Sequence, residues 1–255
     1  MQQTISKLSA ILDEAARLAQ PTIQITNESK ISLDESYEIQ AESIQLRLAR
    51  GEKLTGLKMG FTSKAKMEQM GVHDMIWGRL TNTMCIENKG DLLMSKFIHP
   101  RAEPEIAFLL SNDITKEITI NEVESCIEGL APAIEIIDSR YKNFKFTLED
   151  VIADNCSSSG YVLGEWLSPN RDISNIDITI GVNGEIKASG NSRAILDNPF
   201  QSLVEAVRLS LKYGQELKKG MIILAGAATP AIPINEGDTI EATFGSLGQL
   251  SFHAK

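Results

Sequence analysis

Residues 176–188 have the sequence IDITIGVNGEIKA, the clearest hairpin pattern in this chain of 255 residues. Branched apolar residues occupy every second position up to Val182, as expected for a strand with one buried face. Asn183-Gly184 then supplies the residue pair that most often forms the tight turn of a β-hairpin. A second strand follows through residue 188. We therefore expect an antiparallel sheet in the C-terminal third of the chain.

Further strands are expected on both sides of this hairpin. Each is a short run of mostly apolar residues that lies next to glycine or polar turn residues. The run before the C-terminus, which follows a Gly237-Asp238 turn, is the last clear strand. The expected strands cover residues 57–60, 105–110, 133–137, 221–224 and 239–244.

The first 50 residues are predicted to form two helices. Apolar residues recur at three- and four-residue steps from Ile5 to Ala19, and residues 32–35 (SLDE) have the form of a capping box. Gly51 stands where the second helix would end. Helices followed by many strands favour an α+β fold, with a helical layer over residues 1–52 and a catalytic domain over 53–255 that together can be counted as one domain. Shorter helices are expected over residues 63–70 with Gly71 as the end, after a cap at 121–124, and from Asn198-Pro199 to Tyr213.

Composition excludes several classes of function. The net charge of −9 argues against nucleic-acid binding, which needs clustered lysine and arginine. No apolar run approaches the roughly 18 residues that span a bilayer, and the charged N-terminus does not resemble a signal peptide, so we expect no membrane association and a cytoplasmic location. Three cysteines without CxxC spacing support neither a disulfide framework nor a thiolate zinc site. With only three histidines, a metal would depend on carboxylates, which favours Mg²⁺ or Mn²⁺.

Three glutamates are the candidate metal ligands. Glu103 and Glu105 flank Pro104 before an apolar run, and residues two apart in a strand point to the same face. Glu135 lies in the middle of an apolar strand pattern, where a lone carboxylate needs a cation or donors around it. The pattern alone leaves an alternative open, in which the first two glutamates lie on a solvated face and Glu135 pairs with an arginine or lysine.

Other polar residues are candidates for substrate binding. Lys58 is the single cation of an apolar strand bracketed by glycines, so it could hold a carboxylate or give a proton, although an edge lysine would show the same pattern. The polar segment 154–160, which includes Ser157, offers donors for a carboxylate but equally fits an ordinary loop. The segment 226–230, with Thr229, follows a buried strand, a position where loops over a site often lie.

Several longer motifs, from about residue 54 to the end, resemble one known family. They are GLKMGFTSKAKMEQMGV, HPRAEPEIAF, PAIEIIDSRYKNFKF, ADNCSSSGYVLG, the NGE hairpin and GDTIEATFGSLGQLS. Together they are similar to the 2-oxopent-4-enoate hydratases and 4-oxalocrotonate decarboxylases of the fumarylacetoacetate hydrolase superfamily. The resemblance implies a mostly-β roll of mixed sheets with helices outside. It also implies a divalent ion on Glu103, Glu105 and Glu135 that chelates a 2-oxo acid, with Lys58 at the substrate and Ser157 beside it.

The residue at position 76 favours one branch of this family. Hydratases typically have an aspartate there, and Ile76 can neither activate water nor deliver a proton. An apolar wall suits a decarboxylase, whose site should stay dry. The string DSRYKNFKF also resembles the decarboxylase branch. The expected reaction converts 2-oxohex-3-enedioate (4-oxalocrotonate) to 2-hydroxypenta-2,4-dienoate and CO₂, within the meta-cleavage degradation of aromatic compounds.

Other functions remain as alternatives. The first is the hydratase itself. The second is an acylpyruvate-type hydrolase, which would need an acid–histidine pair to activate water, and this sequence offers no obvious one. The third is a non-catalytic subunit that binds carboxylates or serves assembly. The expected partners are a small 2-oxo dicarboxylic acid, further copies of the chain in a homo-oligomer, and a related hydratase that would receive the labile product.

Overall fold

The computed structural model describes residues 2–63, 67–68 and 74–255. The two N-terminal helices form as expected, and the Ser32 hydroxyl and the Glu35 carboxylate make the predicted capping box. The helix expected over residues 63–70, with its end at Gly71, lies largely outside the described residues. The described α-helices are α1 (Gln2–Leu18), α2 (Leu33–Ala49), α4 (Val123–Cys126), α5 (Leu148–Ala153) and α6 (Pro199–Lys212).

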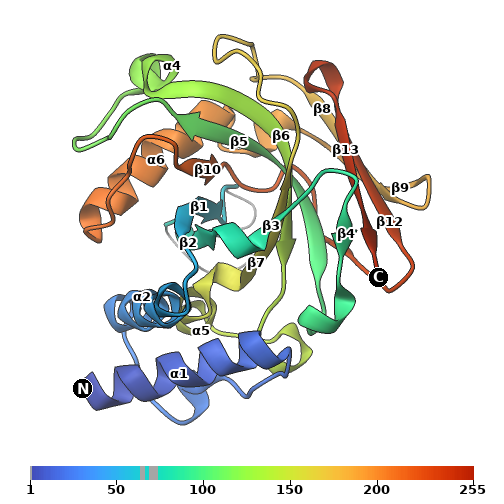
Figure 1. The fold of residues 1–255 in the computed structure, drawn as a ribbon. Coiled ribbons are helices and arrows are strands. Elements are labelled where there is room, and N and C mark those ends of the chain that lie inside the picture. The colour runs from blue at the N-terminus through green and yellow to red at the C-terminus, as the bar shows by residue number, and fades with distance from the viewer. Residues whose placement is uncertain (1, 64–66, 69–73) are drawn as a thin grey trace.

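A large mixed sheet curls into a roll (Figure 1). In the described part of the chain its strands follow the order β2-β1-β10-β5-β6-β7-β3, with β11 paired to β5. The long antiparallel pair of β5 and β6 lies at the centre of the roll. The strands of the roll are β1 (Leu54–Gly60), β2 (Ile76–Thr81), β3 (Cys85–Ile86), β5 (Arg101–Leu110), β6 (Ile127–Ile137), β7 (Ser158–Leu163), β10 (Ile222–Leu224) and β11 (Ile232–Pro233).

A second sheet contains the predicted hairpin and packs against the roll. Asn183 and Gly184 both have left-handed φ angles, 53° and 81°, as the tight turn requires. The sequence expectation that 239–244 is the last strand is wrong. A further strand follows it, because the short segment after Gly248 again alternates buried and exposed residues. The order is β4-β13-β12-β8-β9, with β4 (Asp91–Leu92), β8 (Asp177–Val182), β9 (Glu185–Asn191), β12 (Thr239–Phe244) and β13 (Gln249–Ala254).

One helix cap also differs from the expectation. The 3₁₀ turn that leads into α4 is capped by Thr119, whose backbone N–H and hydroxyl both bond to the Glu122 carboxylate at 2.7 and 2.8 Å. The predicted cap, which begins at Asn121, is therefore two residues too late. Asn198, in contrast, caps α6 as predicted, by accepting a hydrogen bond from the Phe200 N–H at 3.0 Å.

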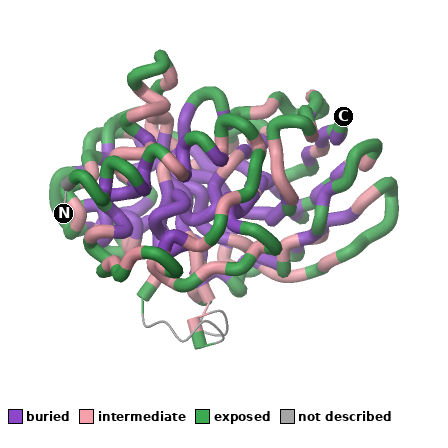
Figure 2. The backbone as a smooth tube through the Cα atoms, turned by 90° about the horizontal axis from the view of Figure 1, so that it is seen from below, coloured by how far each residue is buried: buried purple, intermediate pink, exposed green. Residues whose placement is uncertain are grey.

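Buried residues fill the centre of the molecule, and exposed residues surround it (Figure 2). The largest apolar cluster joins the roll to α6 and the second sheet, and a smaller one joins α1, α2 and α5. A third cluster lies on the other face of the roll strands and includes Ala107, Ala133 and Leu224. Glu105 and Glu135 lie two residues from Ala107 and Ala133, so they share this inner face.

Candidate active site

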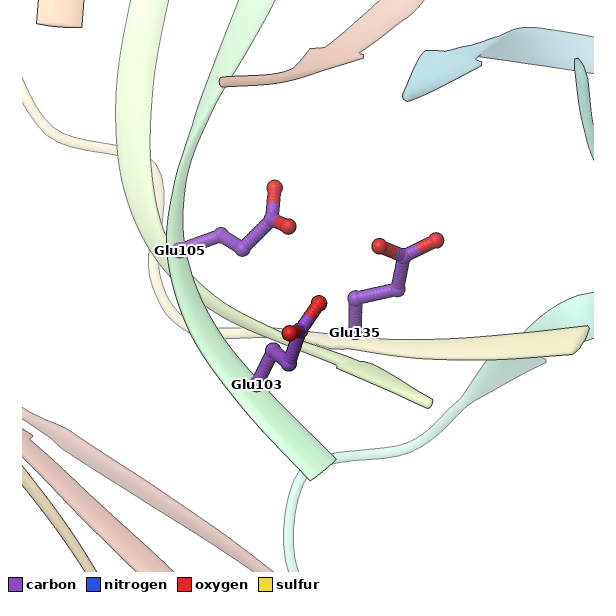
Figure 3. A group of neighbouring side chains, drawn as sticks. All are labelled: Glu103, Glu105 and Glu135. Atoms are coloured by element: carbon purple, nitrogen blue, oxygen red, sulfur yellow. The ribbon is translucent and has the colours of Figure 1, made fainter. Parts of the chain in front are cut away.

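The register of β5 and β6 brings three carboxylates together. Glu103 lies directly opposite Glu135, and Glu105 is two residues further along the same face of β5. One oxygen from each of the three carboxylates lies within 4.8 Å of the chosen oxygens of the other two. Figure 3 shows the three side chains reaching into the same space from the two strands. Their exposed fractions are only 8%, 0% and 0%, so the first two glutamates do not lie on a solvated face. The other half of that alternative, a lysine paired with Glu135, does occur.

Burial makes these charges costly. It raises the pKa of the Glu105 carboxyl well above its usual range, and the Glu135 carboxylate raises it further, against the opposing effect of Lys58. Burial likewise raises the pKa of Glu135, again with Lys58 opposing. The Gly226 N–H donates to Glu105 Oε2 at 2.7 Å, while Glu105 Oε1 is buried without a hydrogen-bond partner among the described residues. This all-oxygen, anionic set is of the kind that hard divalent cations prefer.

Lys58 lies beside this cluster. Its Nζ is 2.8 Å from Glu135 Oε2, and its side chain is 5% exposed. Burial alone would lower the pKa of the ammonium group, but the carboxylates of Glu135 and Glu105 outweigh burial and raise it. The edge-lysine alternative is wrong, because β1 has β2 on one side and β10 on the other.

The glycines around Lys58 are required by packing within the protein. A Cβ on Gly56 would lie 2.0 Å from the backbone oxygen of Ile222, and a Cβ on Gly60 would lie 2.9 Å from the Ile76 side chain. Both glycines therefore permit close packing within the protein, and their presence is explained without a ligand.

The polar segment around Ser157 leads into β7, which pairs with β6. Ser157 is 3% exposed, and its hydroxyl is buried without a partner in the described part of the chain. The neighbouring Cys156 donates its S–H to the Trp77 carbonyl at 3.0 Å. Burial raises the pKa of this thiol to about 12, so it is an unreactive, structural cysteine.

Ile76 and Thr229 are both buried. On β2, Gly78 lies opposite Lys58. Ile76 is two residues before Gly78 and lies opposite Gly60, so its side chain is on the same face of the sheet as Lys58. Thr229 lies in the loop after β10, which contacts β5 through a hydrogen bond from the Ala228 N–H to the Pro104 carbonyl at 3.0 Å. Its own hydroxyl donates to the Pro230 carbonyl. A role for either residue at the substrate stays a prediction.

The role of Gly226 was not predicted from the sequence. Gly226 has a φ of +105° and no room for a Cβ beside Thr62, so only glycine can present its N–H to Glu105. Arg140 forms a buried ion pair with Asp154, beyond the end of β6. The signal for Gly226 was a glycine directly after a buried strand. The ion pair of Arg140 agrees with the role expected from the sequence DSR at residues 138–140 after an apolar strand, which is to form an ion pair or position a loop.

Comparison with known proteins places this fold and site in a family. Residues 57–254 match the family model described as fumarylacetoacetate (FAA) hydrolase C-terminal. The chain belongs to this family. The match covers both β-sheets and all three clustered glutamates, whereas α1 and α2 precede it. The division into a helical layer and a catalytic domain stays a prediction.

Individual members of the fumarylacetoacetate hydrolase family match over the full length. A 4-oxalocrotonate decarboxylase of Pseudomonas sp. is 46% identical over 97% of both chains. A 2-hydroxyhexa-2,4-dienoate hydratase of Comamonas testosteroni is 31% identical over 94% of this chain and 93% of its own. The solved structure of 4-oxalocrotonate decarboxylase from Pseudomonas putida G7, complexed with magnesium and adipate, has a TM-score of 0.96 and 31% identity, and the match covers 100% of this chain and 98% of that one.

Membrane insertion through a helix finds no support in the described residues. None of their helices is long and apolar enough to cross a bilayer.

Proposed function

We propose that this protein is a metal-dependent lyase that decarboxylates 2-oxohex-3-enedioate to 2-hydroxypenta-2,4-dienoate and CO₂. The observation that carries the proposal is the buried cluster of Glu103, Glu105 and Glu135 beside Lys58. It occurs in a chain that aligns over almost its whole length with a 4-oxalocrotonate decarboxylase. The relative named as a hydratase is less similar, at 31% identity against 46%.

Glu103, Glu105 and Glu135 would hold a divalent ion, Mg²⁺ or Mn²⁺. Lys58 supplies a positive charge beside Glu135. When bound, such an ion would act as a Lewis acid toward the carbonyl of a 2-oxo acid. The Gly226 N–H holds Glu105 by one oxygen and leaves Oε1 for a further partner.

The surrounding residues suit loss of the distal carboxylate. That loss leaves an electron pair at C5 that is conjugated through C3=C4 to the C2 carbonyl. Lys58, held by Glu135, would provide a positive charge and a proton donor beside the candidate metal ligands. Ser157 offers a hydroxyl donor, and Thr229 lies in the loop that contacts β5. Ile76 makes an apolar wall that keeps water from the developing charge.

The hydratase is the second candidate, because hydratases are among the relatives that match nearly the whole chain. Against it stands Ile76, which cannot activate water. A non-catalytic carboxylate-binding or assembly subunit is the third candidate, and it predicts metal binding without turnover of any 2-oxo acid.

The proposal extends to partners and location. We expect a homo-oligomer and a complex with a related hydratase, because the dienol product is labile and direct transfer would protect it. We place the enzyme in the cytoplasm, where small-molecule catabolism supplies its dicarboxylic acid.

The deciding experiment gives the purified protein 2-oxohex-3-enedioate with Mg²⁺ and follows CO₂ release and the ultraviolet absorbance of the dienol. Release of CO₂ with accumulating dienol is the expected result. Absence of CO₂, together with Mg²⁺-dependent consumption of 2-hydroxypenta-2,4-dienoate in a parallel assay, would identify the hydratase instead. Mg²⁺ binding with no reaction in either assay would favour the non-catalytic subunit.

A substitution tests the role of Glu135. We expect Glu135→Gln to abolish decarboxylation by weakening Mg²⁺ binding, since a neutral amide is a poorer ligand than a carboxylate for a hard cation. The control is Glu128→Gln, which changes an exposed glutamate on the same strand. Calorimetric Mg²⁺ titration and CO₂ release measure both variants, and unchanged Mg²⁺-dependent turnover in Glu135→Gln would remove this residue from the site.

A further inference from the structure

Three consecutive residues before β7 have left-handed backbone angles. The φ angles of Asn155, Cys156 and Ser157 are 49°, 51° and 59°, although none of the three is glycine. Side chains with a Cβ rarely adopt this conformation, and single residues are the usual case. Runs of this kind persist only where the surroundings impose them, and they concentrate at functional sites.

Asn155 fastens this turn to the edge of β2. Its Oδ1 accepts the Arg79 N–H at 2.7 Å, and its Nδ2 donates to the Arg79 carbonyl at 2.9 Å. The side-chain amide thus takes the place of a neighbouring strand for that residue. A Cβ at Gly78 would lie 2.5 Å from the Asn155 carbonyl oxygen, so glycine is needed for this approach.

The fastened turn closes the roll beside the candidate metal ligands. β2 begins the strand order of the roll and β7 lies near its other end (Figure 1). The turn leads into β7 and is bonded through Asn155 to β2, so it connects the two ends. On one side, Gly78 lies opposite Lys58. On the other, the Ser158 hydroxyl lies beside Glu135, where it lowers the pKa of that carboxyl.

One group on this turn has no structural use. The Ser157 carbonyl accepts the Asp138 N–H at 2.7 Å, and the Ser157 N–H donates to the Asp154 carbonyl at 2.9 Å. The Ser157 hydroxyl, in contrast, is buried without a partner among the described residues. A buried hydroxyl in this state is costly unless a ligand completes its hydrogen bonding.

We infer that Asn155 is a positioning residue, which holds the left-handed turn so that the Ser157 hydroxyl donates to a carboxylate oxygen of the bound 2-oxo acid. The inference rests on the proposed function, because it takes the substrate end from there. The hydrogen bonds of Asn155 to Arg79 hold the turn and with it the Ser157 hydroxyl. Without them the turn can relax and the donor moves away.

Asn155→Gly tests this inference, because glycine keeps the left-handed backbone and removes only the amide. Asn183→Gly is the matched control. Asn183 also has a left-handed φ, 53°, and its amide makes two similar bonds, to the Thr239 N–H at 2.8 Å and to Asp238 at 3.2 Å, but it lies in the β8–β9 hairpin. The probe is oxalate, whose adjacent carboxylates mimic a 2-oxo acid, titrated calorimetrically in the presence of Mg²⁺.

We expect Asn155→Gly to bind oxalate about ten- to a hundredfold more weakly, the loss expected for one hydrogen bond to a charged group. Mg²⁺ affinity without oxalate and the unfolding temperature should change no more than in Asn183→Gly. Ser157→Ala should lose a similar factor, and the double variant should be no worse than Ser157→Ala, because both changes remove the same interaction.

Additive losses in the double variant would overturn the inference, as would full oxalate affinity in Asn155→Gly. The outcome is separate from that of the proposed function. If the wild type releases no CO₂ but the oxalate results hold, the reaction is wrong and the positioning role stands. If CO₂ is released but Asn155→Gly binds oxalate as tightly as the wild type, the proposed reaction stands and the positioning role of Asn155 is wrong.

Discussion

At the scale of single residues, the buried glutamates of the site lower the stability of the metal-free protein, and the same groups are the candidate ligands of the metal. Burial raises the folded-state pKa of Glu105, so keeping this carboxyl ionised costs stability that a bound metal would offset. Glu105→Gln replaces one of three crowded carboxyls by a neutral amide, and we expect it to raise the free energy of unfolding of the metal-free protein by about 1 kcal/mol. Urea unfolding in the presence of a chelator measures this, with Glu128→Gln as the control. A less stable Glu105→Gln variant would show that Glu105 serves the fold.

Single residues also differ in how far the sequence reveals them. Glu135 and Lys58 were visible because each places one charge within an apolar strand, where burial demands a partner. Asn155 was not visible, since an asparagine in a polar segment is typical of any loop. Its importance depends on Arg79, which lies 76 positions earlier in the chain.

At the scale of elements, local signals predicted the bounds of α2 and α6 but misplaced the cap before α4. The capping box of α2 also has a measurable pH dependence. Hydrogen bonds from the Ser32 backbone and hydroxyl lower the pKa of Glu35, so its stabilising effect is complete above the usual value of 4.5 and is lost as the pH falls through the lowered pKa.

The corresponding prediction concerns Ser32→Ala. This variant should lose about 1 kcal/mol of unfolding free energy at pH 7, the usual effect of removing a helix cap, and the difference should shrink below pH 4. Urea unfolding at the two pH values measures it. Ser246→Ala, at an exposed serine that caps no α-helix, should show neither effect. A loss that stays constant down to pH 3 would mean that the Glu35 carboxylate contributes nothing.

At the scale of the whole molecule, the site exists only when the roll is complete. Its ligands come from β5 and β6, while Lys58 comes from β1 and Gly226 follows β10. An unfolded chain has no such arrangement, so Mg²⁺ should bind the folded state alone. At about 100 times its dissociation constant, Mg²⁺ should raise the free energy of unfolding by about 2.7 kcal/mol, and a chelator should reverse the gain.

Thermal unfolding during a Mg²⁺ titration checks this expectation. The Ser32→Ala variant should show the same gain, because Ser32 is an exposed residue before the start of α2 and is not one of the three candidate ligands. Glu105→Gln should show little or none. A full gain in Glu105→Gln would place the stabilising Mg²⁺ elsewhere on the protein.

The sequence by itself determined the short-range features: the capping box of α2, the tight turn at Asn183-Gly184, the strand patterns and the charges placed within them. These depend on residues within a few positions of one another, where spacing and chemistry suffice. Only the tertiary structure decided that Glu103 and Glu105 are buried, that Glu135 stands opposite Glu103, and that Asn155 closes the roll. Strand register and burial result from packing between distant segments, so no local pattern contains them.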